Sequence, residues 1–185
     1  HIIAQENKEK IELDEIEILS SPRIQIESSQ NSISVLTISQ EQINNSTATN
    51  ISELLQQIAG LDVRRRGIEG MQADLYIRGG SFDQTLLLID GIKVEDPQTG
   101  HHTMNMTLPL EVIEKIEIVK GAASRMYGQN AFTGAVNIIT KKDIENNISF
   151  GLAGGSFDQK RGNITIQKEY ENSNILVNYN RKDSE

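Results

Sequence analysis

The spacing of hydrophobic positions divides the chain into three parts. Residues 1–31 are mostly polar and acidic, and their small apolar island at Leu13, Ile16 and Ile18 cannot build a core. Short β-branched runs and one helical pattern predict a folded domain over residues 32–142. Residues 143–185 alternate apolar with polar positions, which is typical of strands with two different faces. We therefore expect a flexible arm, a domain and a set of terminal strands.

The clearest helix is predicted over residues 50–58. Asn50 is positioned to cap it, and Glu53 completes a capping-box-like pair. Gly60 is expected to end it in the left-handed conformation. Four apolar residues share one face of this helix: Ile51, Leu54, Leu55 and Ile58.

The other elements predicted in the domain are short. Asp90-Gly91 lies between two apolar runs and predicts a hairpin. The consecutive apolar residues 86–89 predict a strand that is covered on both faces, and residues 99–108 predict a long polar loop of the kind that is often functional. Strands are expected at residues 33–38, 61–65, 74–77, 85–89, 92–94, 115–119 and 135–140, with a short helix at residues 122–127. The fold class is α+β, a small mixed sheet with short helices.

The terminal segments alternate around Ile148, Ile164 and Ile175, and Leu176 is the one exception to the separation of apolar from polar positions. Taken alone, these strands favour a soluble antiparallel meander. Outer-membrane barrel strands have the same alternation.

Composition excludes several classes of function. The net charge of -8 argues against a nucleic-acid partner, and the absence of cysteine excludes disulfides and thiolate metal sites. His101 and His102 are adjacent in a polar loop with no third ligand nearby, so no metal and no cofactor is expected. The sequence offers no nucleophile and base arrangement and no paired carboxylates, so an enzyme is not expected.

Five short motifs follow one another along the predicted domain: Ile77-Arg78-Gly79, Leu88-Ile89-Asp90-Gly91, Ile116-Glu117-Ile118-Val119-Lys120-Gly121, Tyr127-Gly128 and Gly134-Ala135-Val136-Asn137-Ile138-Ile139-Thr140. In this order they resemble the plug domain of TonB-dependent outer-membrane receptors. Within the family, the loop at residues 96–102 is most similar to the vitamin B12 transporter-like subgroup. The resemblance implies that residues 143–185 are the first antiparallel strands of a transmembrane β-barrel, truncated here, with the plug at residues 32–142 inside its lumen.

The resemblance also implies a TonB box at residues 13–20, on an arm with its N-terminus in the periplasm. TonB, energised by ExbB and ExbD, would add a strand to this segment, and strand addition needs extended residues on an otherwise unfolded arm. The residues expected to bind TonB are Leu13, Asp14, Glu15, Ile16, Glu17, Ile18 and Leu19.

Two further sets of residues follow from motif position. Substrate contacts are expected from the apical loops, defined here as residues 67–73 and 96–106, through Gly67, Glu69, Met71, Gln72, Asp96, Gln98, His101, His102 and Asn105. Ion pairs between plug and barrel wall are expected from Arg78, Lys120, Glu117 and Arg125. Arg78 is favoured over Lys120, because lysine cannot pair bidentately with a carboxylate.

These expectations describe an outer-membrane active transporter of a Gram-negative bacterium that takes up a scarce nutrient. Cobalamin is the favoured cargo, and a ferric siderophore or haem is the alternative. A surface-exposed lipoprotein partner is left open. A soluble binding or adhesion module is the alternative from another class of function.

Overall fold

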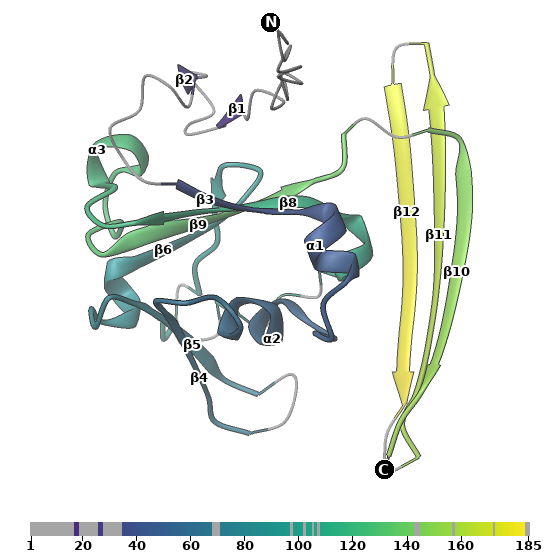
Figure 1. The fold of residues 1–185 in the computed structure, drawn as a ribbon, viewed down its shortest axis with the longest axis horizontal. Coiled ribbons are helices and arrows are strands. Elements are labelled where there is room, and N and C mark those ends of the chain that lie inside the picture. Colours follow the sequence, from purple (N-terminus) through teal and green to yellow (C-terminus); the bar gives the residue numbers. More distant parts are fainter. Residues whose placement is uncertain are drawn as a thin grey trace, which may run out of the picture.

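The computed structural model describes residues 17–18, 26–27, 35–67, 71–96, 98–101, 103–104, 106, 108–142, 145–156, 158–171 and 173–183. Figure 1 shows two bodies side by side. We call residues 35–142 the central domain and residues 147–183 the terminal sheet. Within these residues the fold is the predicted α+β arrangement of a mixed sheet, short helices and antiparallel strands.

A five-stranded sheet forms the middle of the central domain, in the order β3-β8-β9-β6-β7. Its strands are β3 (Val35–Ser39), β8 (Ile113–Lys120), β9 (Gly134–Thr140), β6 (Thr85–Ile89) and β7 (Ile92–Lys93). Strands β6 and β9 pair in parallel, and the other neighbours are antiparallel. The hairpin predicted at Asp90-Gly91 is present as the β6–β7 pair.

Helices and a second ribbon cover one face of this sheet. These elements are α1 (Gln40–Asn44), α2 (Ile51–Gln56) and the antiparallel pair β4 (Leu61–Arg65) and β5 (Ala73–Ile77). Leu87 belongs to the core on this side, while Leu86 and Leu88 belong to a smaller core that includes Ala123, next to α3 (Ser124–Tyr127). The prediction that β6 is covered on both faces is therefore confirmed.

Helix α2 is shorter than predicted. Its last turn tightens, because Gln57 and Ile58 donate to carbonyls three residues back. Asn50 accepts from the Glu53 amide, as expected of an N-cap. The Glu53 carboxylate, however, accepts from the amide and hydroxyl of Thr49 at 2.8 Å rather than from Asn50. Gly60 adopts the expected left-handed conformation, with φ +83°.

Two of the recognised motifs form one hydrogen-bonded joint. Asp90, at φ +50°, accepts from the amide and the hydroxyl of Thr140 at 2.9 and 2.7 Å. The Gly91 amide donates to the Asn137 side chain at 3.0 Å. At Gly134, an added Cβ would lie 2.4 Å from the Val119 carbonyl oxygen, so no larger residue fits there. These motif positions are therefore set by the packing of the sheet.

The terminal sheet consists of β10 (Asn147–Gly154), β11 (Lys160–Tyr170) and β12 (Ser173–Asp183), all antiparallel. The register places the apolar positions of all three strands on one face, which points away from the central domain. Phe150 and Leu152 on this face are 80% and 87% exposed. Its apolar residues are Ile148, Phe150, Leu152, Ile164, Ile166, Ile175, Val177 and Tyr179.

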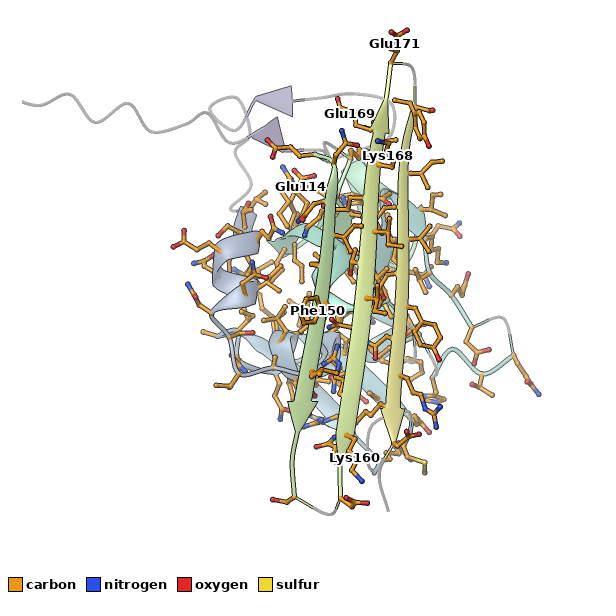
Figure 2. All side chains as sticks on the ribbon, turned by 90° about the vertical axis from the view of Figure 1, so that its right-hand side faces the viewer. Glu114, Phe150, Lys160, Lys168, Glu169 and Glu171 are labelled. Carbon is orange, nitrogen blue, oxygen red and sulfur yellow. The ribbon has the colours of Figure 1, made fainter. Side chains whose placement is uncertain are left out.

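Figure 2 views the terminal sheet from the side away from the central domain. Phe150 lies midway along the strands, Lys160 lies at one end, and Lys168, Glu169 and Glu171 lie at the other. The apolar face is thus a band between two charged ends.

Short elements complete the described residues. These are the two-residue strands β1 (Glu17–Ile18) and β2 (Ile26–Glu27), which pair with each other, and the 3₁₀ turns η2 (Phe82–Gln84) and η3 (Leu110–Val112). In the portion of the chain that is described, no helix has the length and apolar character needed to span a bilayer.

Candidate functional site

The central domain lies on the polar face of the terminal sheet. Arg161 and Asn163 are two positions apart on β11, so both side chains point to the same face. The Arg161 guanidinium donates to the Glu111 carboxylate at 3.1 Å, and the Asn163 amide donates to the same oxygen at 2.6 Å. Glu111 lies in η3, so this contact joins the two bodies. We call these three residues the junction cluster.

The junction cluster also reaches α2. The second terminal nitrogen of Arg161 donates to the Thr49 carbonyl at 3.0 Å, next to the Asn50 cap. The Arg161 and Glu111 side chains are 21% and 33% exposed, so the pair is partly shielded from water. Burial lowers the pKa of nearby Lys141, against the opposing effect of the Glu111 charge.

A groove of about 590 Å³ follows the junction between the central domain and β12. Leu108, Pro109 and Val112 line it from the central domain, and Leu176 lines it from β12. Leu176 was the exception in the alternating pattern. Its apolar side chain points toward the central domain and is half-buried there, which accounts for the departure.

The residues predicted to pair with a barrel wall lie in the central domain. Lys120 donates to the Ala59 carbonyl just beyond α2. Glu117 is buried, with Lys115 at 3.1 Å. Burial, with a further contribution from the Glu117 charge, raises the pKa of Tyr127 to about 12.

Arg78 is exposed and adopts φ +52°. The side chain of Arg125 lies outside the described part of the chain. The pairing of these residues with a wall stays a prediction. Sequence reasoning missed the junction cluster, because Glu111 and Arg161 are 50 positions apart and neither belongs to a motif.

The second apical loop is fastened to the domain at several points. Asp96 closes a local turn by accepting from the Gln98 and Thr99 amides at 3.2 and 3.1 Å. His101 Nδ1 lies 3.0 Å from the Asp74 carboxylate on β5, and its ring lies 4.1 Å from that of Phe82. Met104 is buried in the main core. The predicted loop is present, but parts of it pack closely on the domain.

The first apical loop joins β4 to β5. Figure 1 places this ribbon at the end of the central domain opposite β1 and β2. Met71 is half exposed, Gln72 donates to Asp74 at 3.2 Å, and Gly67 follows β4 at φ +156°. Glu69, His102 and Asn105 lie outside the described residues, and substrate contact by any of these positions stays a prediction.

An arginine beside this loop is held by two neighbours. Arg64 pairs with Asp62 at 2.8 Å and lies over the Tyr76 ring at 4.4 Å. The hydrogen bond from Arg64 to Asp62 raises the pKa of the guanidinium. The ribbon thus carries an exposed ion pair beside a partly buried aromatic ring.

Two predicted TonB-binding residues are described. Glu17 and Ile18 form β1, and they pair with Glu27 and Ile26. The backbone at this point is extended, as strand addition requires. Leu13, Asp14, Glu15, Ile16 and Leu19 lie outside the described residues. Among the residues that the structure describes, no group of three potential metal ligands comes together.

Comparisons with known proteins point to one family. The family model for the TonB-dependent Receptor Plug Domain matches residues 25–135. The Vitamin B12 transporter BtuB of Vibrio cholerae serotype O1 is 33% identical over 80% of this chain and 24% of that protein. BtuB of Vibrio vulnificus is 29% identical over 77% of this chain and 23% of that protein.

A solved structure extends the match to the fold. The pyoverdine outer membrane receptor FpvA from Pseudomonas aeruginosa superposes with a TM-score of 0.69 at 17% identity, over 89% of this chain and 24% of that one. The present chain spans about a quarter of the length of the curated relatives that it matches.

Proposed function

Because this chain belongs to the family of TonB-dependent receptor plug domains, we propose that its central domain closes the lumen of an outer-membrane barrel whose wall begins with β10–β12. The family consists of receptors and transporters that use TonB and bind small ligands, and we propose no catalytic step for this chain. Because the chain belongs to this family, we set aside the alternative of a soluble binding or adhesion module.

The observation that carries this proposal is the two-sided terminal sheet. Its polar face holds the central domain through the junction cluster, while its apolar band faces outward with Phe150 80% exposed. Strands that line a lumen on one side and contact lipid on the other have this division. Burial of apolar side chains contributes about 25 cal/mol per Å², which favours placing the band in a bilayer.

We propose cobalamin as the cargo, because two curated relatives that each match over three quarters of this chain are vitamin B12 transporters. A ferric siderophore is the second candidate, because the structure of a pyoverdine receptor superposes on the chain. Haem remains a third, and a surface-exposed lipoprotein partner is compatible with each.

Calorimetric titration of the intact receptor tests the cargo. We expect cyanocobalamin to release heat and saturate at one site, and ferric pyoverdine to give no signal. If only ferric pyoverdine gives a heat of binding, the cobalamin proposal is wrong and siderophore uptake is supported. Binding of neither compound would reject both cargoes.

We further propose that TonB, energised by ExbB and ExbD, binds residues 13–20 from the periplasmic side. The extended pairing of Glu17 and Ile18 supports this proposal. Replacing Ile16 by proline removes a backbone donor that strand addition uses. We expect Ile16→Pro to abolish uptake while cargo binding stays unchanged.

Lys8→Pro is the matched control for this experiment, since it lies on the same polar arm but outside the box. It should leave uptake intact. Equal loss of uptake in both variants would place the TonB contact elsewhere.

A further inference from the structure

One buried carboxylate touches both apical loops. Asp74 lies on β5 and is only 2% exposed. One of its oxygens is 3.0 Å from His101 Nδ1 in the second loop, and the other accepts from Gln72 Nε2 at 3.2 Å in the first. We call Gln72, Asp74 and His101 the apical bridge. Through these three residues, two loops that are distant in sequence contact the same Asp74 carboxylate.

The surroundings fix the geometry of this contact. The His101 ring is held against Phe82 at a centroid distance of 4.1 Å. The residue before it, Gly100, has φ +72°, and an added Cβ there would lie 3.3 Å from the Phe82 ring. The Asp96 turn fixes the chain just upstream through the Thr99 amide. His101 is therefore presented to Asp74 by a preorganised turn.

A buried carboxylate is costly unless its oxygens are hydrogen-bonded. Both Asp74 oxygens have partners here, and each partner comes from a different loop. Removing either partner leaves a carboxylate oxygen poorly solvated, so the position of one loop affects the energy of the other. This coupling needs no direct contact between the two loops.

We infer that Asp74 is a positioning residue that holds the two apical loops as one unit, so that a ligand bound to either loop orders both. The inference rests on the proposed function, because it assumes that these loops contact the cargo. It gives a role in loop positioning to Asp74, a β5 residue that is not among the expected substrate contacts.

Hydrogen exchange on the intact receptor in detergent, without ligand, tests the coupling. We expect His101→Ala to speed exchange in its own loop and also in residues 67–73. We expect Asp74→Ala to speed exchange in both loops by roughly 10- to 100-fold, the order of effect for losing a hydrogen bond to a charged group. Asp74→Asn keeps the shape and a hydrogen-bonding side chain, so it should restore part of the protection.

Thr103→Ala is the matched control, because this partly buried side chain lies in the same loop, outside both the bridge and the expected substrate contacts. It should leave residues 67–73 unchanged. The amides of β8 and β9 report on the folding of the central domain. If Asp74→Ala speeds exchange there, the variant is unfolding generally, and His101→Ala and Gln72→Ala then decide whether the two loops are coupled. The inference is overturned if His101→Ala affects only its own loop and Gln72→Ala likewise affects only the first loop.

A second measurement adds the cargo. We use cyanocobalamin and ferric pyoverdine as probes, and we expect the one that binds to protect both loops in the wild type but only one loop in Asp74→Ala. Protection of both loops in that variant would contradict the inference. If neither probe binds, the proposed cargo fails, while the exchange measured without ligand still decides whether Asp74 couples the loops.

Discussion

Replacing Arg161 should loosen the central domain from the terminal sheet. Arg161→Met keeps most of the side-chain volume but removes the donors to Glu111 and to the Thr49 carbonyl. It leaves Glu111 with the Asn163 amide, at 2.6 Å. The junction should therefore weaken without collapse of either body.

The magnitude follows from burial. Fully exposed ion pairs contribute about 0–1 kcal/mol, and hydrogen bonds to charged groups contribute about 1.5–3 kcal/mol. The Arg161 and Glu111 side chains are 21% and 33% exposed, between these limits. We therefore expect a coupling of about 1–2 kcal/mol, which is about a 5- to 30-fold change in the undocked population.

A double-mutant cycle measures this coupling. The variants Arg161→Met, Glu111→Gln and the pair are compared by hydrogen exchange of residues 108–114 in the intact receptor. Arg181→Met is the control, because Arg181 pairs with Asp183 on its own strand and both side chains are well exposed. A coupling indistinguishable from zero, or an equal effect of Arg181→Met, would refute the assignment of the junction.

Three other outcomes are expected. Asp90→Ala should lower the free energy of unfolding of the central domain by about 2–3 kcal/mol in urea titration, because the Thr140 amide and hydroxyl lose their acceptors; a change under 0.5 kcal/mol would contradict it. Tyr127→Phe should stabilise by about 1 kcal/mol, since the Tyr127 hydroxyl is buried without a hydrogen-bond partner in the described chain. Because the pKa of Tyr127 is raised to about 12, wild-type stability should also fall as pH rises from about 10 to 12, and the variant should lack this component. Burial opposes ionisation of Glu53, but hydrogen bonds from Thr49 and the Arg65 charge prevail and lower its pKa. The ionised Glu53 carboxylate therefore stabilises the fold above its ordinary pKa of 4.5, and this stabilisation is lost as pH falls through the lowered value. Glu53→Gln should consequently make the free energy of unfolding less dependent on pH in the acid range.

Local patterns predicted the elements of this fold well. The spacing of Ile51, Leu54 and Leu55 indicated α2 because a helix repeats over a few residues. The alternation around Ile148 and Ile164 likewise indicated strands with one apolar face. Both signals lie within a short stretch of sequence.

Long-range arrangement was less accessible from the sequence. The parallel pairing of β6 with β9 depends on contacts across about fifty residues, which no local period encodes. Asp74 could have been noticed, since one carboxylate between Ala73 and Leu75 in an apolar run suggests a buried polar group. Its partners, however, could not be named without the fold.

The joint between Asp90 and Thr140 has a consequence for a chain without cysteine. It fastens two positions fifty residues apart, as a disulfide would, and so closes a loop of that length. Unlike a covalent cross-link, the hydrogen bonds of this joint can break and re-form without an oxidant or a reductant. Under the plug function proposed above, this connection would break and re-form by thermal motion alone each time the domain opens.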